Sequence, residues 1–147
     1  MKKYEFTGET KQVGFFGNIT LKRIRATMEF GIIKIGDLGG WIEKEENLSH
    51  KGDAWVWGDA EVYGNAEVFS ISHVLVVGPI GSRNDFTTFF RDKDSEITVK
   101  CGCFLGKIDK FLEKVCKTHG DSKYAIVYRT AVEIAKQQID LSEEKQA

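Results

Sequence analysis

The sequence predicts an α+β protein whose β-rich N-terminal half contains a short coil of strands, followed by a β-hairpin and two C-terminal helices. Three observations predict this class. Residues 4–35 alternate in the manner of strands between glycines, residues 52–69 repeat every six positions, and the apolar spacing becomes helical after residue 108. We expect two parts: a β-meander with the repeat in residues 1–72, and an α+β module in residues 73–147.

The N-terminal part is predicted to be a β-meander that leads into the repeat. Strands are expected at residues 4–6, 20–26 and 32–35, because polar and apolar side chains alternate there and glycines separate the segments. Residues 36–42 begin with the same Gly-Asp pair that the repeat uses at its corners, and residues 47–52 fit a degenerate first unit. The meander should therefore cap and extend the coil.

The repeat itself reads GDAWVW, GDAEVY and GNAEVF. A period of six fits neither a continuous helix nor a flat strand, but it fits short strands joined by tight corners at Gly-Asp or Gly-Asn. In each unit Ala and Val point to one face, and Trp55, Glu61 or Glu67 points to the other. Three units make about one coil, which is too short to bury its own surface. Flanking strands or other chains must complete it.

Beyond the repeat, the pattern predicts a short strand and then a hairpin. The strand is expected at residues 74–77 and ends at the glycine-proline corner of residues 78–81. Strands at residues 86–91 and 97–104 are predicted to pair through the polar turn at residues 92–95.

The last third is predicted to be helical. One helix runs from Ile108 to a stop at Gly120, and a second is capped by Asp121 or Ser122. The polar residues 142–147 are expected to fray. The buried face of the second helix should consist of Ala125, Tyr128, Ala131, Val132, Ala135 and Ile139.

Composition excludes several classes of partner. A chain of 147 residues with 41% hydrophobic residues can form a packed core, and its net charge of -1 argues against broad binding of nucleic acid or anionic membrane. No stretch has the length of a membrane span and no signal peptide is recognisable, so a cytoplasmic location is expected. Three cysteines, an odd number, are expected to be reduced thiols.

Two resemblances add to this interpretation. The six-residue pattern resembles the hexapeptide repeat of left-handed parallel β-helices, which implies that the coil is a truncated left-handed β-helix. Residues 36–50 with the repeat are similar to bacteriophage and prophage proteins of this type. The segments GSRN, CGCF and THGD, at residues 81–84, 101–104 and 118–121, resemble the C-terminal module that follows such repeats. The resemblance implies a phage accessory protein that acts in the host cytoplasm.

The polar cluster after the proline corner is the favoured candidate site. Glycines let the backbone approach a ligand, Ser, Arg and Asn supply donors for an anion, and phenylalanines offer a surface for stacking a nucleobase. The alternative is an ordinary strand connection in which the arginine pairs with a local carboxylate. The candidate ligand-binding residues are Ser82, Arg83, Asn84 and Phe86, with Arg91 and Lys100 as secondary charges.

A second set of residues suggests metal chemistry. Cys101, Cys103, Cys116 and His119 are of the types that bind zinc, and alternation in a strand points the first two thiols the same way. The Cys-x-Cys spacing is tighter than that of the usual zinc knuckle, and Cys116 fits the apolar face of a helix. We therefore favour structural cysteines and expect neither a metal nor another cofactor.

Two enzyme hypotheses are weaker. A nucleophile from Cys101 or Cys103 with His119 or His73 lacks a carboxylate at a fixed offset to orient the histidine. His50, beside the repeat, resembles the histidine that hexapeptide-type acyltransferases use at a trimer interface. A single coil leaves little room for the acyl donor of such an enzyme.

Aromatic pairs suggest self-association. In strands, one ring of Phe15–Phe16 and one of Phe89–Phe90 would face outward, and an outward phenylalanine needs a partner. Together with the incomplete coil, this predicts a homo-oligomer, either a trimer on a threefold axis or a dimer through the C-terminal helices. The leading hypothesis is a non-enzymatic accessory protein that binds a nucleotide signal of host defence. The alternatives are a protein-binding inhibitor of host defence, a structural or assembly protein of the virion and, third, a hexapeptide-type transferase.

Overall fold

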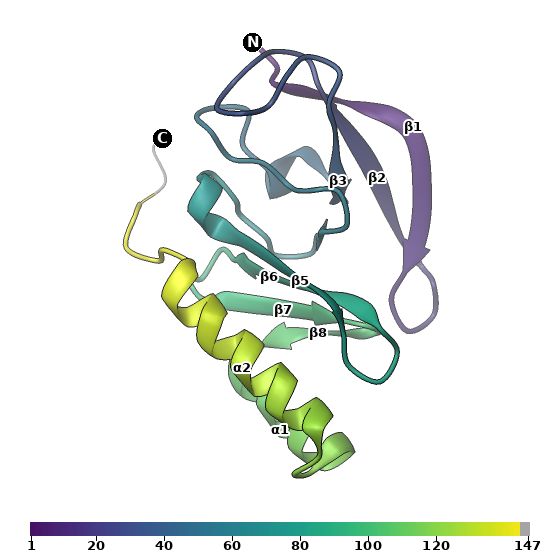
Figure 1. The fold of residues 1–147 in the computed structure, drawn as a ribbon. Helices are drawn as coiled ribbons and strands as arrows, with labels where there is room; N and C mark the ends of the chain where they lie inside the picture. The colour runs from purple at the N-terminus through teal and green to yellow at the C-terminus, as the bar shows by residue number, and fades with distance from the viewer. Residues whose placement is uncertain (145–147) are drawn as a thin grey trace.

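The computed structural model describes residues 1–144 and confirms an α+β architecture. Two four-stranded sheets follow one another along the chain, with strand orders β1-β2-β3-β4 and β5-β6-β7-β8. The helices α1 and α2 lie together against the second sheet, and within residues 1–144 no α-helix covers the first sheet (Figure 1). Within the described residues, neither helix has the length and apolar character needed to cross a bilayer.

The first sheet starts from a long hairpin. β1 (Tyr4–Val13) and β2 (Ile19–Ala26) pair antiparallel, with Tyr4 opposite Ala26 at the base and Val13 opposite Ile19 near the tip. β3 (Leu38–Ile42) adds antiparallel to β2, and the short β4 (Glu61–Val62) adds parallel to β3.

The strand predicted at residues 32–35 is wrong. Residues 27–37 form a loop. Within it, Gly31 and Gly36 flank residues 32–35 in left-handed conformations, and the Gly36 amide donates to the Ala26 carbonyl. These glycines turn the chain too sharply for a strand. The loop covers Trp55, whose ring lies 5.4 Å from that of Phe30 and is buried, although the repeat placed Trp55 on the face opposite Ala54 and Val56.

The repeat forms a coil in which the chain returns beside itself after 20 residues. Trp41 pairs in parallel with Glu61, and Leu48 bridges in parallel to Val68. The inward direction of the Ala and Val positions is confirmed, since all six are fully buried. The coil is completed within the chain: β2 covers one side, and on the other the Ala66–Asp92 bridge joins it to the end of β6. The buried positions are Ala54, Val56, Ala60, Val62, Ala66 and Val68.

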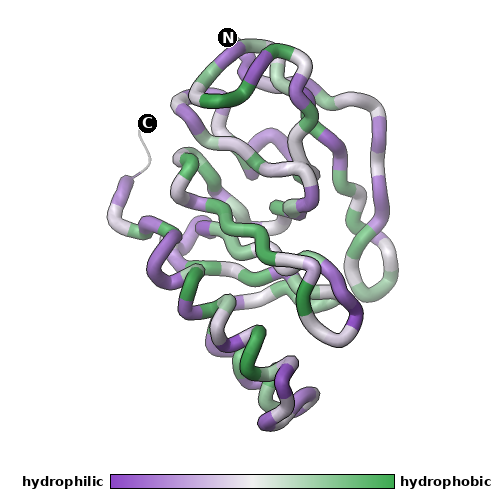
Figure 2. Tube along the Cα trace, in the orientation of Figure 1, coloured by the Kyte–Doolittle hydropathy of each residue, from purple (hydrophilic) through white to green (hydrophobic). Residues whose placement is uncertain are grey.

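The second sheet contains β5 (Val74–Ile80), β6 (Asp85–Arg91), β7 (Ile97–Cys101) and β8 (Phe104–Lys107), all antiparallel. The hairpin predicted from residues 86–91 and 97–104 is present. Its second strand is broken, because a turn at Gly102 in a left-handed conformation folds β8 back on β7. Apolar residues run along β5 and recur on one side of α2 (Figure 2).

Both predicted helices are confirmed. α1 (Ile108–His119) ends at Gly120, and α2 (Lys123–Gln138) follows Ser122 as its N-cap. Every residue predicted for the inner face of the second helix is buried. Cys116, predicted on the inner face of α1, is exposed instead. The predicted fraying of residues 142–147 concerns in part residues 145–147, which lie outside the described residues.

The second sheet lies between two hydrophobic cores and contributes side chains to both. Phe90 and Val74 pack into the core of the coil, whereas Phe89 and Val99 pack under the two helices. The prediction that one ring of Phe89–Phe90 faces outward is therefore wrong, because this sheet is covered on both faces. β5 begins close to the expected boundary at residue 72, but the first core extends across that boundary to include Val74.

Candidate functional site

A hollow of about 60 Å³ lies where β7, α1 and α2 meet. Its floor is apolar and aromatic, and its rim carries a thiol, two hydroxyls, an imidazole and an ammonium group. Among the described residues, none of those that line it is acidic. The lining residues are Cys101, Phe104, Phe111, Lys114, Val115, Thr118, His119 and Tyr128.

The order of the elements brings these side chains together. Cys101 is the last residue of β7, and the Gly102 turn sends the chain through β8 directly into α1. α1 places Thr118 and His119 in its last turn and ends at Gly120, whose left-handed conformation reverses the chain into α2. Tyr128 then lies on the inner face of α2, opposite the end of β7.

Tyr128 is the centre of the polar contacts. Burial, followed by the proximity of Cys101, raises the pKa of Tyr128 to about 12. The Thr87 hydroxyl donates to Cys101 Sγ at 3.5 Å from the neighbouring strand β6. The His119 ring lies 5.6 Å from the Tyr128 ring. Tyr128 therefore remains a protonated phenol, able to donate, at neutral pH.

The β5–β6 loop approaches the same hydroxyl from the other side. A Cβ atom on Gly81 would lie 1.8 Å from Tyr128 Oη, so only glycine allows this approach. Gly81 also has a positive φ of 79°. Two charges of the loop act on the Tyr128 pKa in opposite directions, Asp85 raising it and Arg83 lowering it. Arg83 is an exposed cation on this loop, two residues after Gly81.

The six predicted ligand-binding residues do not form one site. Ser82, Arg83 and Asn84 are exposed together on the β5–β6 loop. Phe86 is half-buried and packs across the hairpin on Gly78, where a Cβ would lie 2.6 Å from the Phe86 ring. Arg91 and Lys100 are buried elsewhere.

Arg91 and Lys100 hold parts of the fold together. Arg91, at the far end of β6, donates to Ser95 Oγ at 2.9 Å and to the backbone carbonyl of Glu143, and it lies over the Phe69 ring. Lys100 forms an ion pair with Glu61 of β4, which joins the two sheets. Buried charges need partners, and both residues have found them within the chain.

The cysteines and His119 do not converge on one point. Cys101 and His119 both line the hollow, but Cys103 and Cys116 are exposed and do not. Within residues 1–144, no group of three or more histidine, cysteine or acidic side chains is arranged to hold a metal ion. The geometry gives the zinc hypothesis no support.

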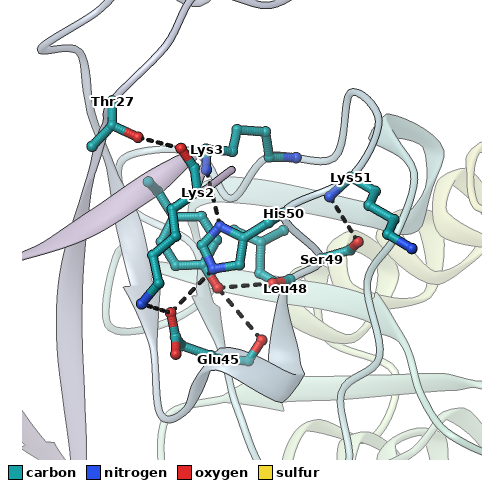
Figure 3. A network of polar contacts seen from close by, with 9 residues as sticks. Lys2, Lys3, Thr27, Glu45, Leu48, Ser49, His50 and Lys51 are labelled. Carbon is teal, nitrogen blue, oxygen red and sulfur yellow. Dashed lines mark hydrogen bonds and ion pairs between the residues drawn. The ribbon is translucent and has the colours of Figure 1, made fainter.

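His50 belongs to a network that anchors the N-terminal segment (Figure 3). The Lys3 backbone N–H donates to His50 Nδ1 at 3.0 Å, and His50 Nε2 lies 3.1 Å from Glu45 Oε1. The ring stacks on Tyr4 with 4.0 Å between centroids. The hydrogen bond from His50, followed by that from Lys2, lowers the pKa of Glu45. Both ring nitrogens are engaged, so the geometry does not favour a catalytic role for His50.

Tyr128, Thr118 and Lys114 were not predicted as site residues. Tyr128 was assigned to the apolar inner face of the second helix, where its ring does lie. The available signal was its polar tip: a hydroxyl on a buried face needs a partner, and that requirement marks a polar site inside the core. No protein-family model matches the sequence, and no curated protein shows significant similarity to it. Function therefore has to be argued from the site.

Proposed function

We propose that this chain is a non-catalytic, ligand-binding accessory protein of a phage or prophage, and that its ligand is a nucleotide bound at the hollow beside the β5–β6 loop. The observation that carries the proposal is that Lys114, His119 and the hydroxyls of Thr118 and Tyr128 line one aromatic-floored hollow, without an acidic lining residue among those described. Cations and hydroxyl donors around an apolar floor suit a ligand that combines phosphate with a base.

The volume of the hollow decides which part of the ligand can enter it. About 60 Å³ holds roughly four or five water-sized groups, which suits a phosphate and excludes a whole nucleotide. The rest of the ligand would lie along the exposed Ser82, Arg83 and Asn84, where a guanidinium can stack on a base or bind a second phosphate. Gly81 keeps this loop close to Tyr128.

The contacts of Cys101 favour binding over catalysis. Its thiol accepts a bond from the Thr87 hydroxyl, and a nucleophile would have to give up this contact. The resemblance to phage and prophage proteins supplies the setting. In that setting, the protein would sequester a nucleotide that signals infection to the host.

Thermal unfolding with a panel of cyclic oligonucleotides, ADP-ribose derivatives and inorganic phosphate tests the proposal. A bound nucleotide at about 100 times its Kd should raise Tm by roughly 5–10 °C. Arg83→Ala and Lys114→Ala should each abolish most of the shift. Lys110→Ala is the matched control, since it removes an exposed lysine of the same helix that does not line the hollow. Absence of a shift with every anion, or a shift indifferent to both variants, would contradict the proposal.

A second candidate function, assembly with other proteins in the virion, is favoured by one observation. Phe15 and Phe16 at the tip of the β1–β2 hairpin are 80% and 84% exposed. Monomeric proteins rarely present adjacent large apolar side chains at a protruding tip without use. A variant that loses association while keeping its nucleotide response would separate the two functions.

A further inference from the structure

The segment that follows α2 returns to the beginning of the second sheet (Figure 1). Just after the helix ends, the Asp140 amide donates to the Ser72 carbonyl of η2 (Ile71–His73) at 3.1 Å. We call residues 140–144 the C-terminal strap. All five of its residues are exposed, so few contacts hold it in place.

The strap covers a buried arginine. Arg91, at the end of β6, is 4% exposed. Its guanidinium donates to Ser95 Oγ at 2.9 Å and to the Glu143 carbonyl of the strap, and it lies 4.7 Å from the centre of the Phe69 ring. These partners within the chain are all neutral groups. Among the residues that the structure describes, Arg91 forms no ion pair with a carboxylate, although a buried cation is most stable beside an anion.

A buried histidine adds a second donor beside this cation. His73 is fully buried, and the Phe69 amide donates to His73 Nδ1 at 3.2 Å. Burial, followed by the charge of Arg91, lowers the His73 pKa to about 4, so the ring is neutral at pH 7 and carries its one proton on Nε2. Arg91 Nη1 lies 3.4 Å from Nε2. Since neither group can accept from the other, two N–H donors lie side by side.

The strap supplies the oxygen atoms that face these donors. The Glu143 carbonyl accepts from Arg91, and Glu143 Oε2 lies 4.0 Å from His73 Nε2. The acidic side chains of the strap have other surroundings: that of Glu143 is 51% exposed, and Asp140 Oδ1 accepts from the amide and hydroxyl of Ser142. A peptide carbonyl satisfies a hydrogen bond of the guanidinium but does not balance its charge.

We propose that Arg91 and His73 form a site for a phosphate-type oxyanion, and that the C-terminal strap closes this site until the anion displaces it. Guanidinium N–H groups match the oxygens of such an anion, which would supply the counter-charge that the strap lacks. The strap is the part that moves, because its residues are exposed whereas Ser95 and Phe69 hold the two donors. The site lies at the opposite end of β6 from the β5–β6 loop, so the inference does not depend on the proposed nucleotide site.

Amide exchange of the full chain, followed by NMR, tests the displacement. Inorganic phosphate is compared with sodium chloride of equal ionic strength. The Asp140 amide loses its bond to Ser72 when the strap leaves, and phosphate at about ten times its Kd for the open site should speed its exchange about tenfold. The Ile139 amide, bonded to the Ala135 carbonyl, is the matched control and should not change. Glycerol phosphate in place of inorganic phosphate distinguishes a phosphate ester from the free anion as the source of the group.

Two variants separate the cation from the strap. Arg91→Gln removes the positive charge and should abolish the effect of phosphate. Asp140→Ala/Ser142→Ala removes the two exposed side chains that order the strap and leaves Arg91 in place. Phosphate should then bind about threefold more tightly or better, as titration of the amide shifts measures. Lys114→Ala alters the hollow under the helices and should leave the phosphate response of the strap unchanged.

Four results would overturn the proposal. These are an Asp140 amide that phosphate does not affect in the wild type, a folded Arg91→Gln chain that responds as the wild type does, a strap variant that binds phosphate no more tightly, or a response that Lys114→Ala abolishes. The last result would assign the anion to the hollow. If Arg91→Gln does not fold, the strap variant still decides, because it changes exposed side chains alone.

Discussion

The two sheets of this protein are packed in different ways, although they share a wall. Around the first sheet the backbone packs on backbone: a Cβ on Gly40 would lie 2.2 Å from the Trp57 carbonyl oxygen and 2.6 Å from that of Ala60. The second sheet is packed through large side chains: the ring of Phe111 on α1 meets Phe89 of the sheet and Tyr128 of α2 edge to face. Close backbone packing leaves no room for a ligand, whereas packing through large side chains leaves a hollow.

The polar side chains of the two regions also have different partners. In the coil they satisfy backbone carbonyls: the Asn47 amide donates to Gly64 and Ala66 at 3.2 Å, and the Lys3 ammonium donates to Gly52 and Ala54. Burial lowers the Lys3 pKa to about 8. Under the second sheet, Tyr128 and Cys101 both line the hollow. The first region supplies shape and the second supplies candidate chemistry.

The largest expected effect breaks the close packing of the coil. Gly40→Ala forces a methyl group against two backbone carbonyls that cannot move without opening the coil, and we expect a loss of more than about 5 kcal/mol or failure to fold. Gly58→Ala is the control, since nothing lies within 4 Å of its Cβ position. Urea unfolding measures both. A Gly40→Ala protein as stable as the control would contradict backbone contact as the basis of the coil.

The second prediction concerns the two faces of the second sheet, which belong to different hydrophobic cores. Phe89→Ala and Phe90→Ala each remove a fully buried ring, and each should lower the free energy of unfolding by about 3–5 kcal/mol. Hydrogen exchange should show faster local opening of α1 and α2 in the Phe89 variant, and of the coil in the Phe90 variant. The same regions opening in both variants would mean that the wall does not separate two cores.

The smallest effect concerns His73, at the junction where η2 (Ile71–His73) leads into β5. Burial, followed by the charge of Arg91, lowers the His73 pKa to about 4. The unfolded chain therefore binds the proton more tightly than the folded chain, so this stability is present above pH 6.5 and lost as pH falls towards 4. About 2 kcal/mol should disappear between pH 7 and pH 5.

Urea unfolding at the two pH values measures this term. His73→Gln removes the titrating group and should reduce the pH dependence by that amount. An unchanged slope in the His73 variant would exclude this group as the cause.

Local patterns predicted the fold where local rules decide it. The inward Ala and Val positions of the repeat and the buried face of α2 follow from periodicity alone. Periodicity did not reveal what lies on the second face of a strand. One ring of Phe89–Phe90 was expected to face outward, because the helices that cover Phe89 come later in the chain. Arg91 and Lys100 appeared available because their partners, Glu143 and Glu61, are distant in sequence. Tyr128, which lines the hollow beside Cys101, was not among the candidate residues.

The bridge between Ala66 and Asp92 has a consequence for the order of folding. Backbone bonds from Glu67 to Arg91 and from Lys93 to Asn65 hold the last rung of the coil to the end of β6. During synthesis, the hydrogen bond between Asn47 and Val68 can form as soon as both residues have left the ribosome. The contacts between the coil and the end of β6 can form only after about two dozen further residues have been made. The coil is therefore synthesised first and completed late. Until β6 has been made, the backbone groups of residues 65–67 remain open to pairing with other strands.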